Sequence, residues 1–477
     1  MGGFFGVVSK GDCVPDLYYG TDYHSHLGTR RGGMAVLNGN EYNRSIHDIT
    51  NAQFRSKFDS DISSMNGRSG IGVISDYEDQ PLIIGSHLGT YAIVTVGAVR
   101  NAEALAKQAF KTRAVHFSEM SGNEINPTEV IATIINQEES FEAGISRALE
   151  MVEGSCSMLV LTKNGIYAAR DRDGRTPVVI GKKEGAHCIT FESCAFPNLD
   201  YEAVKELGPG EIALVTGNGF EIKKPAGKEL QICAFLWIYY GYPASSYEGV
   251  NVERSRYACG AALARADKVK PDFAAGIPDS GVAHAIGYAM EAGVPYMRPF
   301  VKYTPTWARS FMPQVQAVRE LVARMKLIPV RELTQGQRIL FCDDSVVRGT
   351  QLRDTFRRVF AYGAREIHLR PACPPLLYGC KYLNFSRSKT VFDLAARTAI
   401  KELEGDNEPD LARYCDAGTD QYGAMVDIIK KKMGITTLQY QKLPDMVKAI
   451  GLPKEKLCTY CWDGCEGPCA VKKKQVK

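Results

Sequence analysis

The sequence predicts two consecutive mixed domains: an α+β layered domain and then an α/β domain built on a parallel sheet. Two observations support this fold class. The first ~230 residues contain many short apolar runs separated by glycine turns, with few helical patterns between them. From about residue 250 to 370, helices and strands alternate, as in parallel strands joined by crossover helices.

The first domain is predicted mainly from its strands, which lie at residues 32–37, 71–74, 92–96, 157–161, 165–169 and 211–215. Helical patterns interrupt these strands at residues 101–109, 128–136 and 141–152. Many strands with a few helices indicate sheets covered by helices, which is a layered α+β arrangement.

The second domain is predicted from alternating elements, taken in order as 252–266 (helix), 273–276 (strand), 282–292 (helix), 337–342 (strand), 350–362 (helix) and 366–370 (strand). Residues 383–450 are expected to be helical and more charged. The tail after residue 457 is rich in cysteine and then basic.

Composition excludes several classes of protein. Of 477 residues, 45% are hydrophobic and 23% charged, which excludes a mainly disordered chain. The net charge of +4 is too small to indicate a general nucleic-acid binder. No apolar run approaches the ~18 residues of a membrane span, and the N-terminus lacks the basic start of a secretory signal. We therefore expect a cytoplasmic protein with no nucleic-acid or membrane partner, whose 14 cysteines are mostly buried thiols.

The strongest local signal is the segment 338–352, which reads RILFCDDSVVRGTQL. An apolar strand runs into Asp343 and Asp344, and a short loop containing Gly349 leads into a helix. Backbone N–H groups at such a helix N-terminus bind phosphate well, and the two acids can hold ribose hydroxyls or a cation. An acidic pair alone would indicate an ordinary strand-to-helix turn, but the full string is far more specific.

That string resembles the phosphoribosyl-pyrophosphate (PRPP) loop of type I phosphoribosyltransferases. Surrounding motifs extend the resemblance to one family, glutamine PRPP amidotransferase, over nearly the whole chain. IPDSG at 277–281 resembles its pyrophosphate loop, and RSF at 309–311 and KLIP at 326–329 resemble its flexible catalytic loop. Motifs similar to the back of its glutaminase domain occur at 170–174, 192–194 and 209–212. Each motif alone is weak, but their common order is specific.

The resemblance implies an N-terminal-nucleophile-hydrolase-like α+β sandwich over residues 1–232 and an α/β type I phosphoribosyltransferase domain over 233–455. A Cys-rich metal-binding tail is expected over 456–477. The implied activity is that of an amidophosphoribosyltransferase, which forms phosphoribosylamine from PRPP with Mg²⁺ in the first step of purine synthesis. The family also implies a homo-oligomer with nucleotides as feedback inhibitors.

Site residues follow from the matching motif positions. Arg309 and Lys326 are the expected catalytic residues, because they could neutralise the leaving pyrophosphate as a loop closes. Ser280, Asp343 and Asp344 are the expected Mg²⁺ site. The residues expected to bind PRPP are Asp279, Ser280, Gly281, Asp343, Asp344, Ser345, Val346, Val347, Arg348, Gly349 and Thr350. Ile328 stands where the family usually has Asn.

The glutaminase half departs from the family at each position that handles glutamine. The nucleophile position is Gly2, the carboxylate clamp falls at about Leu88, the oxyanion donor is Val96 beside Gly97, and the amino-group anchor is Pro127. Without a nucleophile or an oxyanion donor, we expect no glutamine hydrolysis. Ammonia would then be free or delivered by another protein. Three residues, Cys13, His24 and His26, could in principle replace the missing nucleophile or base. We expect all three to have structural roles instead.

Four cysteines match the iron–sulfur branch of the family, where they hold a [4Fe–4S] cluster: Cys233, Cys380, Cys458 and Cys461. Cys465 and Cys469 extend the tail to four thiols in twelve residues, so a self-contained tail site is an alternative, and a chain without metal is another.

Two other functions remain open from the sequence. One is a catalytically silent regulatory or scaffold protein that binds PRPP or a nucleotide. The other is a transferase whose altered N-terminal pocket admits a different amine donor. PRPP-dependent release of pyrophosphate with ammonium or with glutamine separates these functions.

Overall fold

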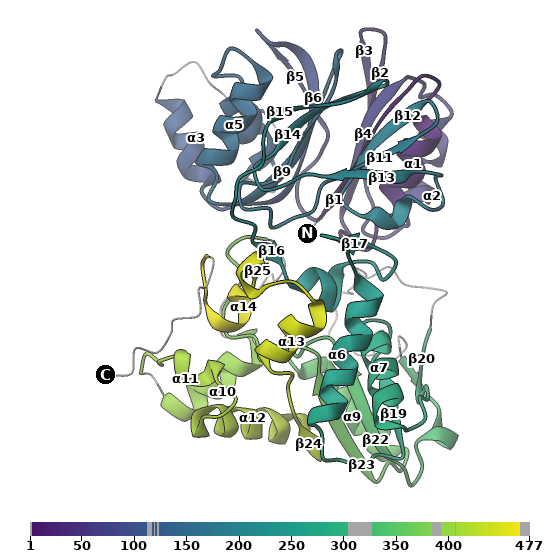
Figure 1. Cartoon of the computed structure of the whole chain (residues 1–477), viewed down its shortest axis with the longest axis vertical. Coiled ribbons are helices and arrows are strands. Elements are labelled where there is room, and N and C mark those ends of the chain that lie inside the picture. The colour runs from purple at the N-terminus through teal and green to yellow at the C-terminus, as the bar shows by residue number, and fades with distance from the viewer. Residues whose placement is uncertain are drawn as a thin grey trace.

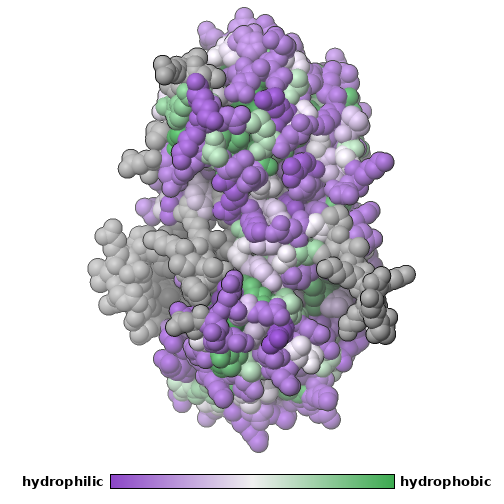
Figure 2. Space-filling model, turned by 90° about the vertical axis from the view of Figure 1, so that its left-hand side faces the viewer, coloured by the Kyte–Doolittle hydropathy of each residue, from purple (hydrophilic) through white to green (hydrophobic). Residues whose placement is uncertain are grey.

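The computed structural model describes residues 2–111, 117–118, 120–121, 124–303, 327–383, 393–405 and 407–467. A β-rich N-terminal half and a C-terminal half with a parallel sheet stack along the long axis of the molecule (Figure 1). Hydrophilic side chains cover most of the face drawn in Figure 2, and hydrophobic side chains form smaller areas on it. Within the described residues, every helix is too short or too polar to cross a membrane.

Two antiparallel sheets form the N-terminal half. One has seven strands in the order β13-β11-β12-β1-β4-β2-β3, and the other has six in the order β15-β14-β10-β9-β6-β5. The seven strands are β1 (Gly3–Ser9), β2 (Arg31–Asn38), β3 (Glu41–Asp48), β4 (Ser69–Ser75), β11 (Val179–Lys183), β12 (Ala186–Thr190) and β13 (Glu202–Glu206). The six strands are β5 (Leu82–Ser86), β6 (Gly89–Val99), β9 (Gly154–Thr162), β10 (Gly165–Ala169), β14 (Ile212–Thr216) and β15 (Gly219–Lys224).

Side-chain alternation along the strands explains this packing. In β6, Ala92 and Val94 face the core between the sheets, whereas Tyr91 and Ile93 face the helices outside. The seven-stranded sheet is covered by α1 (Val14–Asp22) and α2 (Phe54–Ile62), and the six-stranded sheet by α3 (Ala102–Phe110), α4 (Pro127–Ile135) and α5 (Phe141–Met151). The result is two sheets between two layers of helices, which confirms the layered α+β arrangement expected from the sequence.

Several short elements lie within the N-terminal half or in the segment that connects the two halves. They are β7 (Met120–Ser121), β8 (Glu124–Ile125), η1 (Ser193–Ala195), η2 (Leu236–Tyr240), β17 (Ser246–Tyr247) and β18 (Val250–Asn251). The segment from η2 to β18 leads directly into the first helix of the C-terminal half.

The C-terminal half is built on a parallel sheet in the order β19-β22-β23-β24, comprising β19 (Phe273–Gly276), β22 (Arg338–Asp343), β23 (Glu366–Pro371) and β24 (Thr437–Leu438). One face packs against α6 (Val252–Ala266) and α7 (Val282–Ala292). The other packs against α9 (Thr350–Ala361), α10 (Ala395–Glu404) and α12 (Asp420–Met433). Both faces are therefore buried, which explains the continuous apolar run of β22.

The remaining elements border this core and bring the tail back to the middle of the molecule. They are β20 (Phe300–Lys302), β21 (Leu327–Pro329), η3 (Arg331–Leu333), α11 (Ala412–Cys415), α13 (Leu443–Ile450), η5 (Lys454–Lys456), β25 (Leu457–Cys458) and α14 (Tyr460–Asp463). Strand β25 pairs in parallel with β16 (Ile232–Cys233), and the Trp462 ring stacks on Phe235 at 4.6 Å between centroids. The tail is thus folded onto the segment between the two halves (Figure 1).

Candidate functional site

Two loops meet at the carboxyl ends of the neighbouring parallel strands β19 and β22. The first loop, residues 277–281, precedes α7, and its Pro278–Asp279 peptide is cis. The N–H of Ile277 donates to the carbonyl of Cys342 at 3.0 Å. A Cβ atom at Gly281 would lie 2.3 Å from the same carbonyl oxygen, so glycine is required for the two loops to lie this close. The predicted pyrophosphate and PRPP loops are therefore in contact.

The acidic pair is buried at this junction. Asp343 and Asp344 are each 6% exposed. The N–H of Asp344 donates to Oδ1 of Asp343 at 2.9 Å, and the hydroxyls of Ser280 and Ser345 bond to the Asp344 carboxylate. Burial raises the pKa of Asp343 well above its usual range, and the Asp344 charge raises it further. Two crowded, desolvated carboxylates are a donor set that a cation would stabilise.

The loop from Ser345 to Gly349 joins β22 to α9 in a compact turn. Val346 is buried in the core, which anchors the loop. The carbonyl of Val347 accepts from the N–H of Ala395 at 2.7 Å. Gly349 precedes the helix with φ of +73°, a conformation that favours glycine, and α9 begins at Thr350. Arg348 is exposed and reaches Asp393 at 3.4 Å. The loop therefore presents a helix N-terminus beside the acidic pair.

Two charged residues at this site escaped the sequence analysis. Lys302, at the end of β20, forms an ion pair with the exposed Asp279. Arg256 of α6 is buried, donates to the carbonyls of Tyr239 and Gly241 at 2.7 and 2.8 Å, and directs its charge toward Asp344. A lysine that ends an apolar strand was a usable signal for Lys302, whereas nothing local marks Arg256.

The predicted catalytic residues Arg309 and Lys326 lie outside the described residues. Ile328, in β21 beside that segment, is 48% exposed. The other predicted PRPP and Mg²⁺ positions lie on the two loops just described.

A second site is a pocket between the two sheets of the N-terminal half. This pocket, named here the N-terminal pocket, lies between the ends of β1, β4, β6, β9 and α4. Gly2, Val96, Gly97 and Pro127 all line it, so the structure brings together four of the predicted glutamine-handling positions.

The placement of the carboxylate clamp at Leu88 is wrong. Leu88 lies in the turn between β5 and β6, where it packs against the hydrophobic cluster beneath α3, α4 and α5. Gly3 pairs with Ile74 in the antiparallel register of β1 and β4, which sets Ser75 next to Gly2 at the pocket. A match to residues 85–90 misplaced the clamp, because only strand pairing identifies the neighbour of Gly2.

Substitute nucleophiles and bases are held in structural roles. Cys13 is buried beyond β1, and burial raises the pKa of its thiol to about 12, so little reactive thiolate forms. His24 is fully buried: Nδ1 donates to the carbonyl of Gly20 at 2.8 Å, and Nε2 accepts from the N–H of Glu192 at 3.1 Å. His24 therefore contributes packing and hydrogen bonds rather than a free base.

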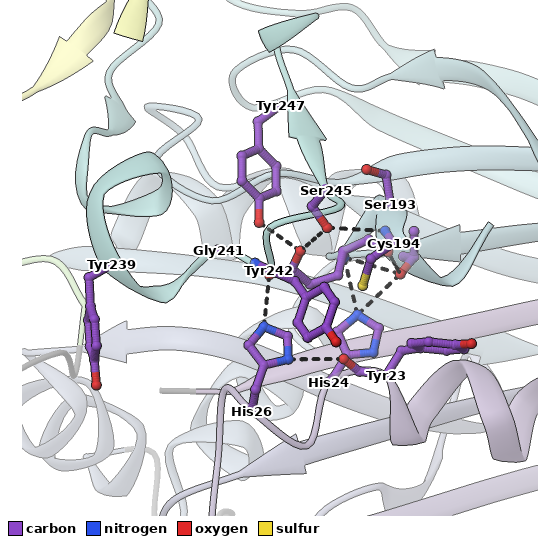
Figure 3. A network of polar contacts seen from close by, with 12 residues as sticks. Tyr23, His24, His26, Ser193, Cys194, Tyr239, Gly241, Tyr242, Ser245 and Tyr247 are labelled. Carbon is purple, nitrogen blue, oxygen red and sulfur yellow. Dashed lines mark hydrogen bonds and ion pairs between the residues drawn. The ribbon is translucent and has the colours of Figure 1, made fainter. Parts of the chain in front are cut away.

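A buried carboxylate network joins the N-terminal half to the segment leading into the C-terminal half (Figure 3). Glu192 bonds to Nε2 of His26 at 3.2 Å and accepts from the hydroxyl of Tyr247 at 2.7 Å and from Ser245. Burial alone would raise the pKa of Glu192, but these partners hold it below its usual value. The 192–194 motif and His26 thus fix the junction between the halves.

The four predicted cluster cysteines come from three segments of the chain, at residues 233, 380 and 458–461, that meet at this junction. Cys233 is the partner of Cys458 in the β16–β25 pair. Cys461, on α14, hydrogen bonds to Cys380, a contact that lowers the pKa of the Cys380 thiol to about 6. The N–H of Leu383 also donates to the Cys380 sulfur at 3.3 Å. As placed in the described part of the chain, no three His, Cys, Asp or Glu side chains form a metal-holding group. Cys469 lies outside the described residues.

Comparison with known proteins identifies relatives of this chain. A family model described as a glutamine amidotransferase domain matches residues 67–196. An amidophosphoribosyltransferase of Archaeoglobus fulgidus is 30% identical over 418 residues, which cover 84% of this chain and 89% of that relative. The chain belongs to the amidophosphoribosyltransferase family.

Other members of the family match over nearly the full length. The enzyme of Methanocaldococcus jannaschii is 28% identical, with 97% of each chain covered. The solved glutamine PRPP amidotransferase of B. subtilis, complexed with ADP and GMP, has a TM-score of 0.82 at 26% identity and 99% coverage of both chains. The expected fold, a glutaminase-type sandwich followed by a type I phosphoribosyltransferase domain, is therefore confirmed.

Proposed function

We propose that this chain transfers the phosphoribosyl group of PRPP to ammonia and forms phosphoribosylamine. In this reaction the bond between C1 of the ribose and the pyrophosphate oxygen breaks, and pyrophosphate leaves with the electron pair. The nitrogen of ammonia forms the new bond to C1 and loses one proton. The observation that carries the proposal is the contact between the two loops, which joins a pyrophosphate-type loop to a buried acidic pair.

The residues of the two loops would bind different parts of PRPP. Asp343 and Asp344 would accept hydrogen bonds from the ribose hydroxyls, and the turn from Ser345 to Thr350 would bind the 5′-phosphate. Asp279, Ser280 and Gly281 would face the pyrophosphate, with Lys302 as a cation beside them. Arg309 and Lys326 are retained as the proposed groups that offset the charge of the leaving pyrophosphate.

The acidic pair also fits Mg²⁺. Asp343 and Asp344 are hard oxygen donors whose charges are poorly compensated when buried, and Ser280 bonds to Asp344. A bound Mg²⁺ would neutralise charge on the pyrophosphate.

Glutamine is not the nitrogen source in this proposal. Gly2 carries no nucleophile, Val96 offers no side-chain donor, and Ser75 beside Gly2 carries no positive charge for a carboxylate. Ammonia would come from solution or from another protein.

We also propose that the chain divides at residues 232 and 455, with the 456–477 tail completing a [4Fe–4S] site. Cys233, Cys380, Cys458 and Cys461 supply four thiols from one neighbourhood. The Cys233 thiol interacts electrostatically with Cys458 and Cys380, and Cys461 interacts with all three others, which supports one shared centre. The N–H of Leu383 at the Cys380 sulfur is the kind of bond that stabilises a cluster thiolate.

The test is a pyrophosphate-release assay with PRPP and Mg²⁺. Ammonium should support release, and glutamine should not exceed the blank without an amine. Release with glutamine alone, together with glutamate formation, would overturn the ammonia dependence. No release with either amine would overturn the transferase activity.

A second candidate is a silent regulatory protein that binds PRPP or nucleotide without turnover. It is favoured by Ile328, an exposed apolar residue where the family usually has a polar one. Saturable PRPP binding without pyrophosphate release would select this candidate. Nucleotide regulation and a homo-oligomer remain proposals, the former supported by the ADP and GMP in the B. subtilis structure.

A further inference from the structure

The N-terminal pocket remains a formed cavity although its glutamine-handling groups are replaced. Two carboxylate residues, Asp76 and Glu78, line it, together with four hydroxyl-bearing residues, Ser75, Tyr77, Thr95 and Ser155. Among the described residues that line it, none is Lys, Arg or His. A ligand with a carboxylate would meet like charge there, whereas a cation would meet opposite charge.

Ser155 provides an independent sign of a ligand. The residue is 2% exposed and lines the pocket from β9. Its Oγ has no hydrogen-bond partner among the described residues. Buried hydroxyls are nearly always bonded, so an unpartnered one at a cavity wall indicates a position for a small polar molecule.

Glu78 is the acidic group best placed to balance a cation. The hydroxyl of Ser75 donates to its Oε2 at 2.9 Å. Burial raises the pKa of Glu78, and the Ser75 hydroxyl, a backbone hydrogen bond and the charge of the N-terminal amine offset this rise only in part. Asp76 is held in place by the N–H of Thr29, which donates to its Oδ1 at 2.8 Å.

The pocket is also shaped against the side chain that the family places there. A Cβ atom at Gly2 would lie 2.3 Å from the carbonyl oxygen of Ile74, so the wall at this position stays bare. A small ligand would use the space that a nucleophilic side chain and the substrate occupy in an active glutaminase.

We propose that the N-terminal pocket binds a small protonated amine that lacks a carboxylate, such as ammonium or a primary alkylammonium ion. The ammonium head would donate to Glu78 and to Ser155, whose hydroxyl oxygen can accept. This inference deepens the proposed function, since it names the class of amine and its entry site. It does not require turnover, because binding can be measured without PRPP.

The experiment is saturation-transfer NMR on the full-length protein, with methylammonium chloride as the probe and no PRPP present. Methylammonium should show saturation transfer that ammonium displaces, and acetate and glutamine should show none. Glu78→Gln and Ser155→Ala should each weaken the binding at least fivefold. The matched control is Asp79→Asn, which removes a neighbouring charge that does not line the pocket.

Several results would overturn the proposal. Equal weakening by Asp79→Asn would indicate general attraction of cations to an acidic surface. Displacement by potassium as effective as by ammonium would indicate a simple cation site, and glutamine binding tighter than methylammonium would restore a glutamine pocket. If Glu78→Gln lowers the melting temperature, Ser155→Ala alone decides. Failure of binding with intact PRPP turnover would reject only this inference, whereas binding without turnover would reject only the transferase proposal.

Discussion

Restoring the nucleophile by Gly2→Cys should not create a glutaminase. A Cβ atom at this position would lie 2.3 Å from the Ile74 carbonyl oxygen, more than 1 Å inside ordinary contact. Strand β1 cannot shift easily to relieve this contact. Gly3 is paired with Ile74, and a Cβ atom on Gly3 would in turn lie 2.5 Å from the His24 ring.

The expected size of the effect follows from these contacts. Overpacking of this kind costs about 1–3 kcal/mol, which corresponds to a melting temperature lower by roughly 2–12 °C. The restored thiol would still lack an oxyanion donor at Val96, a loss of about 10²–10³ in rate by itself. Gly2→Cys should therefore be less stable than the unmodified chain and release no more glutamate.

The assay measures glutamate release from glutamine, with and without PRPP, on protein whose N-terminus has been checked by mass spectrometry. Gly11→Cys is the matched control, because it adds the same thiol where a Cβ atom meets nothing within 4 Å. Glutamate release by Gly2→Cys above that control would refute this reasoning. A diazo-oxo-norleucine adduct on any cysteine of the unmodified chain would reveal another nucleophile, with Cys13 the first to examine.

Three further predictions concern the acidic pair, the thiols and a buried histidine. Asp343→Asn combined with Asp344→Asn should weaken PRPP binding about 10²–10⁴-fold, since hydrogen bonds to charged groups contribute about 1.5–3 kcal/mol each. Calorimetry measures the affinity, with Asp354→Asn as the control. Unchanged affinity in the double variant would reject the site. Protein purified anaerobically should hold about four irons per chain. Cys233→Ser or Cys380→Ser should lose this iron, whereas the control Cys415→Ser should keep it. Iron loss only in Cys465→Ser and Cys469→Ser would favour a tail-only site. Burial lowers the pKa of His24 from 6.5 to about 4, so the unfolded chain takes up the proton first as pH falls. The free energy of unfolding should therefore fall by about 3 kcal/mol between pH 6.5 and pH 4, at ~1.4 kcal/mol per pKa unit, and should keep its full value above pH 6.5. Denaturant titrations measure this free energy at each pH. The same fall with pH in His24→Gln would contradict the prediction.

Local sequence determined the elements and the phosphoribosyl loop. The apolar run of β22, the two acids after it and Gly349 lie within one short stretch, where backbone preference and strand burial act between near neighbours. The short apolar runs of β6 and β9 likewise marked their positions, since one face of each strand is buried against the other sheet and the opposite face against helices. The loss of the nucleophile at Gly2 also needs no fold to be recognised.

Tertiary structure decided which distant residues share a site. Strand register placed Ser75 rather than Leu88 beside Gly2, and cavity walls drawn from β4, β6 and β9 assembled Glu78 and Ser155 into an acidic pocket. Folding of the tail onto β16 brought Cys458 to Cys233 across more than 200 residues. Such neighbours are fixed by sheet pairing and by the packing of layers, whose energies depend on segments far apart in the chain, so no local pattern encodes them.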